Sequence, residues 1–95
     1  MPFKLVYEKR FINDLRNVDK KDKLRIKNKL EWLADNIYNT RHIMLKGDEF
    51  QDVFKLRIGN WRVFYKLDYN AAIIYVLTVM DRKEAYKRNS NIIAL

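Results

Sequence analysis

The sequence of 95 residues has no cysteine, one histidine, one proline and two glycines. Without cysteine there is no disulfide, thiol nucleophile or thiolate metal site, and one histidine excludes zinc sites built on histidine pairs. So little glycine and proline leaves no linker or low-complexity tract. No apolar run approaches the about 18 residues of a membrane span, and no secretory signal is readable. These absences predict one domain over residues 1–95, a cytoplasmic location, no membrane contact, no metal and no small-molecule cofactor.

Positive charge is what the sequence has in excess. Twenty Lys and Arg residues stand against 12 Asp and Glu, a formal net charge of +8, while 48% of the residues are hydrophobic. The chain can therefore form a core, but a domain of this size buries only about two thirds of its chain surface and has little room for an internal pocket. We expect a site on the surface and an anionic partner, with nucleic acid as the first candidate.

The first half of the chain predicts a strand and a helical hairpin. Apolar residues alternate with others through Phe3–Glu8, which is typical of a strand with one buried face. Lys9–Val18 and Lys20–Tyr38 each carry an apolar stripe at helical spacing, and Asp19 between them is a suitable N-cap. Residues 39–52 lack a clear period and are expected to form a connecting loop.

The second half predicts a three-stranded antiparallel meander. Its strands are Phe54–Ile58, Trp61–Leu67 and Ala71–Met80, and Gly59-Asn60 suits a two-residue hairpin turn. The last strand is almost wholly apolar, as in a strand with neighbours on both sides and covered faces. The sequence therefore predicts an α+β fold with a four-stranded sheet and the helices on one face. The last strand is expected to be central and parallel to the first, with a helical or irregular tail from residue 81.

The predicted turn places Arg57 directly opposite Arg62. Like charges in this position destabilise a sheet by a few tenths of a kcal/mol or more, so folding alone does not favour the pair, whereas a bound polyanion does. The alternative is a solvated strand face of a basic protein. The two faces of this hairpin are Phe54, Leu56, Ile58, Trp61, Val63 and Tyr65, which are apolar, and Lys55, Arg57, Arg62, Phe64 and Lys66.

Arg82 and Tyr86 follow the apolar strand four residues apart, on one face if this stretch is helical. Cations and a tyrosine, without metal, carboxylate pair or histidine pair, suit RNA cleavage by its own 2′-hydroxyl. Tyrosine is a poor base at its ordinary pKa of about 10, but surrounding cations favour the phenolate. The alternative for Tyr86 is a ring packed in an amphipathic tail.

The order of elements and the hairpin resemble the RelE/ParE superfamily of toxin–antitoxin toxins. Residues 54–65 are similar to the family pattern Y-K-x-R-x-G-x-Y-R-x-x-Y, and Phe11-Ile12-Asn13-Asp14-Leu15 is similar to F-x-K-D-L. The resemblance implies a small toxin whose RelE branch cuts messenger RNA on the ribosome and is neutralised by an acidic antitoxin. By position it implies a catalytic set of Lys55, Arg57, Arg62, Arg82 and Tyr86, and we expect RNA-binding residues at Lys46, Phe64, Lys66 and Lys83.

The ParE branch is the alternative, since it keeps the fold but poisons DNA gyrase and lacks the ribonuclease set. Four matched cations and a tyrosine favour the RelE branch. One departure from the family pattern is Met80-Asp81, where many members have Gly-His. The change removes the histidine as a proton donor and adds the negative charge of Asp81. Of the other residues, His42 is expected at the surface, and Trp32, off the apolar stripe of its helix, either packs between the helices or marks a partner surface.

Overall fold

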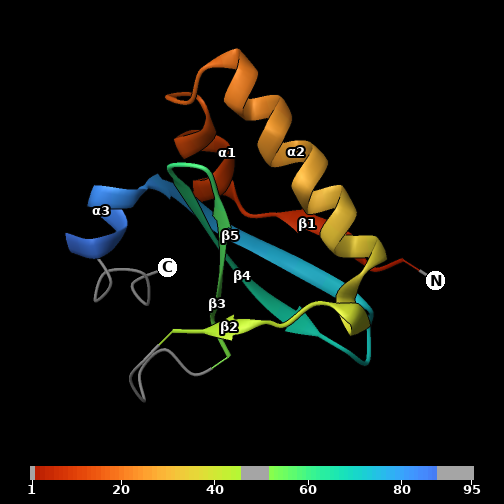
Figure 1. Cartoon of the computed structure of the whole chain (residues 1–95). Helices are drawn as coiled ribbons and strands as arrows, with labels where there is room; N and C mark the ends of the chain where they lie inside the picture. Colours follow the sequence, from red (N-terminus) through yellow and green to blue (C-terminus); the bar gives the residue numbers. More distant parts are fainter. Residues whose placement is uncertain (1, 46–51, 88–95) are drawn as a thin grey trace.

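The computed structural model describes residues 2–45 and 52–87. In this part of the chain a sheet carries two helices on one face, and a short third helix follows the last strand (Figure 1). This confirms the predicted α+β class and the helical hairpin. In chain order the elements are β1 (Lys4–Tyr7), α1 (Lys9–Leu15), α2 (Lys20–Asp35), the 3₁₀ helix η1 (Ile37–Asn39), β2 (Ile43–Met44), β3 (Phe54–Ile58), β4 (Trp61–Asp68), β5 (Ile73–Asp81) and α3 (Arg82–Lys87).

The sheet has the strand order β1-β5-β4-β3-β2. β1 is parallel to β5 and the other neighbours are antiparallel, so the apolar strand lies inside the sheet and beside the N-terminal strand, as predicted. The predicted count of four strands is wrong by one. The extra strand is β2, in which Ile43 pairs with Lys55 and Met44 with Phe54. Two residues have no readable period, and their strand character comes from pairing with a later segment.

The helices begin where the sequence predicts and end earlier. Asp19 caps α2, since its Oδ1 accepts a hydrogen bond of 2.8 Å from the Asp22 N–H. α1 ends at Leu15 and not Val18, and α2 ends at Asp35 because Asn36, with φ −129°, leaves the helical conformation before η1 begins. Among the described residues, no helix combines the length and the hydrophobicity needed to cross a membrane.

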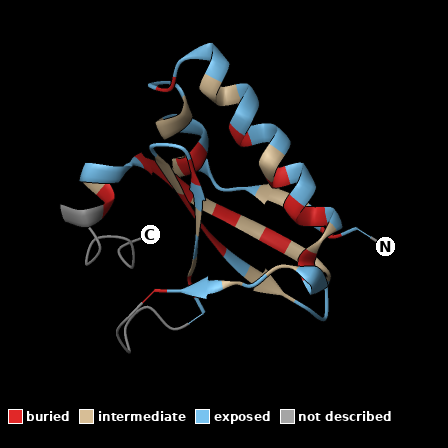
Figure 2. Ribbon diagram, viewed as in Figure 1, coloured by how far each residue is buried: buried red, intermediate tan, exposed pale blue. Residues whose placement is uncertain are grey.

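The main core lies between α1, α2 and the sheet. α2 supplies Ile26, Leu30 and Leu33, each at most 1% exposed, so its apolar stripe faces the strands. Figure 2 shows the buried positions as bands on α2 and along β5. The strand residues that meet this stripe include Ile58, Val63, Tyr65, Ile74 and Val76. The apolar face predicted for the hairpin is thus the face that the helices cover.

A second, smaller core lies apart from the first. It consists of Leu45, Val53, Phe64, Met80 and Ala85, drawn from β4, β5, α3 and the segments beside β2 and β3. Phe64 is only 1% exposed. The prediction that Phe64 binds RNA is therefore wrong, because a buried ring cannot stack on a base. Strand alternation placed it correctly on the arginine face, but segments distant in sequence cover it.

Candidate active site

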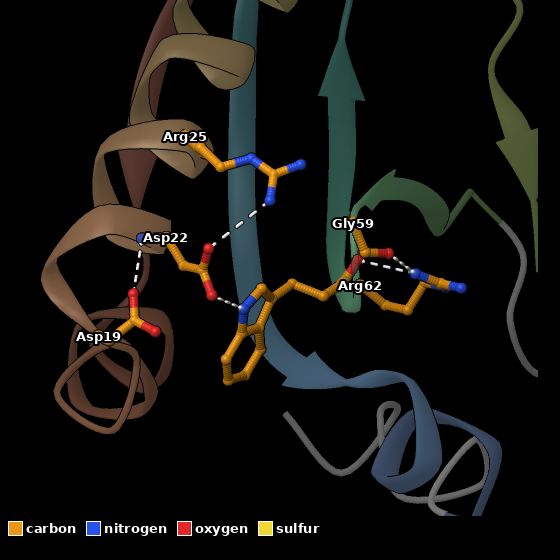
Figure 3. A network of polar contacts seen from close by, with 6 residues as sticks. Asp19, Asp22, Arg25, Gly59 and Arg62 are labelled. Atoms are coloured by element: carbon orange, nitrogen blue, oxygen red, sulfur yellow. Dashed lines mark hydrogen bonds and ion pairs between the residues drawn. The ribbon is translucent and has the colours of Figure 1, made fainter.

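The hairpin turn sets two arginines side by side on neighbouring strands. Gly59 adopts a positive φ of +57°, which a side chain would make unfavourable, and the register pairs Arg57 with Arg62 and Ile58 with Trp61. Both pairings are those predicted from the two-residue turn. The Trp61 indole donates a hydrogen bond to Asp22 of α2, so Trp61 turns toward this helix. Because successive residues of a strand point to opposite faces, Arg62 turns away from it (Figure 3).

The guanidinium of Arg62 is held in place by the turn itself. Its Nη1 donates to the carbonyl oxygens of Gly59 at 2.9 Å and Trp61 at 3.0 Å (Figure 3). Nε and Nη2 make no hydrogen bond to any residue that the structure describes. Arg62 is thus a fixed cation with donors left for a ligand, which suits stabilisation of developing negative charge.

Arg82 joins this pair because α3 starts against the turn. The backbone N–H of Arg82 donates to the Asn60 carbonyl at 2.8 Å, and Asp81 caps α3 by accepting a 2.7 Å hydrogen bond from the Glu84 N–H. Partial burial lowers the pKa of Arg62, and the positive charges of Arg57 and Arg82 lower it further. The guanidinium groups of Arg57 and Arg82 therefore both act on Arg62, at one end of the sheet. We call Arg57, Arg62 and Arg82 the arginine cluster.

No carboxylate neutralises the arginine cluster within the described residues. The ion pairs found there are Arg10 with Asp14 and Arg25 with Asp22, and neither includes a member of the cluster. Over the same residues no three His, Asp or Glu side chains gather where they could hold a metal ion. A group of cations without an ion pair in this part of the chain raises the local concentration of anions, so phosphate groups are a suitable ligand.

The other predicted cations lie at different distances from the cluster. Lys55 is exposed two residues before Arg57, about 7 Å along β3 at a rise of about 3.3 Å per residue. Lys66 is exposed too, but it lies about 13 Å along β4 from Arg62. Lys83 is exposed next to Arg82 in α3. Lys55 and Lys83 are thus within two residues of a cluster member, whereas Lys66 lies farther along its strand.

The structure describes only the backbone of Tyr86 and does not describe Lys46. Tyr86 lies in α3, one helical turn after Arg82, which agrees with the predicted helical spacing; its side chain is outside the described part. Lys46 lies outside the described residues. Asn60, whose carbonyl holds α3 to the turn, was not predicted, and a backbone contact of this kind has no sequence signal.

His42 is not the surface residue that the sequence predicts. Its Nε2 lies 2.9 Å from the Ile37 carbonyl, which can only accept, so Nε2 carries the proton and Nδ1 accepts from the Tyr65 hydroxyl at 2.6 Å. Burial raises the pKa of Tyr65, and so does the nearby Tyr69, which keeps the phenol neutral. Both side chains are committed to the packing of β2 against the sheet, away from the arginine cluster.

Comparison with known proteins agrees with this fold. The family model described as ParE toxin of type II toxin-antitoxin system, parDE, matches residues 5–86. No curated protein matches in sequence. Similar solved structures include the RelBE2 toxin–antitoxin complex of Mycobacterium tuberculosis (TM-score 0.76, 17% identity, 86% of this chain and 93% of that chain). The RelE–RelB complex of Pyrococcus horikoshii (0.70, 21%, 86% and 97%) and the isolated E. coli RelE toxin (0.69, 19%, 96% and 98%) are also similar. At these identities the likeness establishes the fold.

Proposed function

The chain belongs to the ParE toxin family of type II toxin–antitoxin systems, and we propose that this toxin cuts messenger RNA on the ribosome. The observation that carries the proposal is the arginine cluster, three cations at one end of the sheet with no carboxylate partner among the described residues. The matched family model carries the ParE name. The arginine cluster nevertheless favours the ribonuclease chemistry that we expect of the RelE branch.

The reaction we propose uses the RNA as its own nucleophile. The 2′-hydroxyl attacks the adjacent phosphorus, the bond to the 5′-oxygen of the next nucleotide breaks, and the products are a 2′,3′-cyclic phosphate and a 5′-hydroxyl. Lys55 and Arg57 orient the scissile phosphate, Arg62 stabilises the charge of the transition state, and Arg82 assists at the phosphate or the leaving oxygen. Tyr86 is the candidate base that removes the 2′-hydroxyl proton. Neither a metal nor a small-molecule cofactor takes part in these steps.

Poisoning of DNA gyrase without cleavage is the second candidate function. The observation that favours it is the family match itself, since it names ParE over residues 5–86. The two functions make opposite demands on the arginine cluster. A ribonuclease needs the three cations for chemistry, whereas a gyrase poison needs only those that contact gyrase.

We also propose an acidic antitoxin as the partner, as several structurally similar toxins are described in complexes with antitoxins. An apolar groove of about 480 Å³ runs between α1 and α2, and its wall carries Lys20, Lys23 and Lys27. Ile12 and Leu24 in this groove are 50% and 57% exposed. An amphipathic segment with acidic flanks would cover these apolar side chains and meet the lysines. We also propose a cytoplasmic location, since the proposed reaction takes place on ribosomes.

Chemically defined messages test the reaction. The purified chain is mixed with ribosomes programmed with an mRNA, the cut position is mapped, and a second mRNA carries a single 2′-deoxy nucleotide there. We expect cleavage of the first message, a cyclic phosphate on its new end, and no cut at the deoxy position. Cleavage of both messages would overturn the 2′-hydroxyl mechanism. Intact messages together with inhibition of DNA supercoiling by purified gyrase would establish the ParE-type function instead.

A further inference from the structure

A second groove, which is lined by basic residues, lies between α2 and the β3–β4 hairpin. It has a volume of about 520 Å³ and is lined by Arg25, Asn28, Lys29 and Trp32 of α2, with Arg57 and Gly59 of the hairpin. The α2 residues are spaced i, i+3, i+4 and i+7, so they form one stripe along the helix. The groove adjoins the arginine cluster because Arg57 belongs to both.

The aromatic member of this stripe is unusually open for a tryptophan. Trp32 is 45% exposed, although tryptophan is on average highly buried in folded proteins. The Lys29 ammonium lies 4.0 Å from the centre of the indole ring, a cation–π contact that places a charge beside a flat apolar surface. Packing against the main core does not explain this arrangement, since the apolar stripe of α2 faces the other way.

Arg25 is directed to the groove by its neighbours. A Cβ on Gly59 would lie 3.1 Å from Arg25 Nη1 and 3.2 Å from Nη2, so the guanidinium lies close against the turn. Asp22 contacts Arg25 at 3.6 Å and is itself held by a 2.9 Å hydrogen bond from the Trp61 indole (Figure 3). A cation already oriented in this way loses little conformational freedom when it meets a ligand.

We propose that this groove binds a stretch of single-stranded RNA. A base takes the place of the Lys29 ammonium on the Trp32 ring, and Lys29 moves to the phosphate on one side of this base while Arg25 contacts the phosphate on the other side. Cations beside an exposed aromatic ring are the pattern by which proteins hold single strands with little sequence preference. The choice of RNA rests on the proposed function. The strand is either a part of the message beyond the scissile phosphate or an exposed segment of ribosomal RNA.

Affinity for a short labelled RNA tests the groove directly. We would measure binding of a single strand of about ten nucleotides by fluorescence anisotropy over a range of salt. Arg25→Gln with Lys29→Gln is compared with the control pair Lys4→Gln and Lys9→Gln, which removes the same charge from exposed positions outside both grooves. Trp32→Ala is compared with Trp32→Phe, which keeps a ring for stacking. Melting temperatures confirm that each variant is folded.

The expected effects differ between the variants and their controls. The Arg25 and Lys29 pair weakens binding about tenfold or more and reduces the salt slope by about 1.4, from about 0.7 for each lost phosphate contact. Trp32→Ala weakens binding about 5- to 150-fold, and Trp32→Phe restores most of it. Equal weakening by both charge pairs, or equal binding by Trp32→Ala and Trp32→Phe, would overturn the proposal.

Further outcomes identify the strand and separate this inference from the proposed function. If Trp32→Ala slows cleavage of a long message but not of a message trimmed close to the cut, the groove binds the message. If Trp32→Ala slows cleavage of both messages equally, the groove binds ribosomal RNA. If the groove variants bind RNA normally but bind an acidic peptide weakly, the groove is a protein site and the proposal is wrong. The affinity measurement uses free RNA and does not depend on cleavage. Absence of cleavage on ribosomes would therefore refute the ribonuclease function, while the affinity measurement alone tests RNA binding by the groove.

Discussion

The two faces of the sheet differ in what their side chains do. The helix-covered face contributes Val63 and Tyr65 of β4 to a continuous apolar core. The other face carries Arg57 and Arg62 beside the small cluster around Phe64. Since alternate residues of one strand point to opposite faces, β4 supplies both the core and the candidate site.

This difference separates stability from activity within single strands. Side chains on the helix-covered face remove apolar surface from water, which is about 1.5–3 kcal/mol for each large residue that is fully buried. The arginine cluster instead places like charges close together, which opposes folding slightly and favours an anionic ligand. Changes on the two faces should therefore alter different measurements, and the following variants test that separation.

The largest expected effect is on the helix-covered face. Leu30 has no exposed surface, and Leu30→Ala should lower the free energy of unfolding by about 2–5 kcal/mol through lost burial and the cavity left behind. Urea denaturation followed by circular dichroism measures this. Leu24→Ala on the same helix is the control, because Leu24 is 57% exposed and its loss should cost within about 0.5 kcal/mol. Equal losses in the two variants would contradict the assignment of the core.

The arginine cluster should show the reverse behaviour. Arg62→Ala removes a cation from the proposed transition state and should slow cleavage about 100- to 1000-fold. Its unfolding free energy should stay unchanged or rise by a few tenths of a kcal/mol, since repulsion from Arg57 and Arg82 is relieved. Lys66→Ala, on the same strand, is the control. If Arg62→Ala retains near wild-type cleavage at an unchanged melting temperature, Arg62 is only surface charge.

Tyr65 tests the edge between β2 and the sheet. Tyr65→Phe leaves Nδ1 of His42 without its donor and should lower the unfolding free energy by about 1–3 kcal/mol. Because burial raises the pKa of Tyr65, the folded state favours the neutral phenol. Wild-type stability is therefore complete below the ordinary tyrosine pKa of about 10 and falls above it.

The same variant sharpens this pH dependence. Tyr65→Phe should lose less stability than the wild type between neutral pH and pH values above about 10, as measured by urea denaturation. Tyr7 accounts for part of the remaining loss, since burial and Glu31 raise its pKa too. Parallel alkaline curves for the wild type and the variant would show that the Tyr65 phenol is not the group responsible.

The smallest effect belongs to the helix cap. Asp19→Ala removes the acceptor for the Asp22 N–H and should cost about 1 kcal/mol of unfolding free energy, with cleavage unaffected. Asp19→Ser keeps an acceptor oxygen and should restore most of the stability. A melting temperature of the alanine variant equal to that of the wild type would show that water replaces the cap without cost.

Local chemistry explains which elements were predictable. The Gly59-Asn60 turn determines the whole register between β3 and β4, so Arg57 opposite Arg62 followed from two residues. Asp19 and the apolar run of β5 carry equally local signals. β2 does not, because Ile43 and Met44 become a strand only through pairing with β3, and the end of α2 depends on the conformation of Asn36.

The positions of the candidate site residues were predictable where they depend on local signals. The cations of the hairpin are local to the turn, and Arg82 follows directly after β5. The burial of Phe64 was not predictable, since its cover comes from Leu45, Val53 and Ala85, which are far from it in sequence. His42 likewise acquires its role from Tyr65, 23 residues away.

The pairing of β1 with β5 has a consequence for the order of events during synthesis. Lys4 lies opposite Ile73, so the first strand can pair only after the 69 residues that follow Lys4, up to Ile73, have been made. Contacts so distant in sequence form slowly, because a long loop must close first. Arg82 follows β5 at once in the chain. A nascent toxin therefore completes its sheet and its arginine cluster at nearly the same moment, and shorter nascent chains have neither.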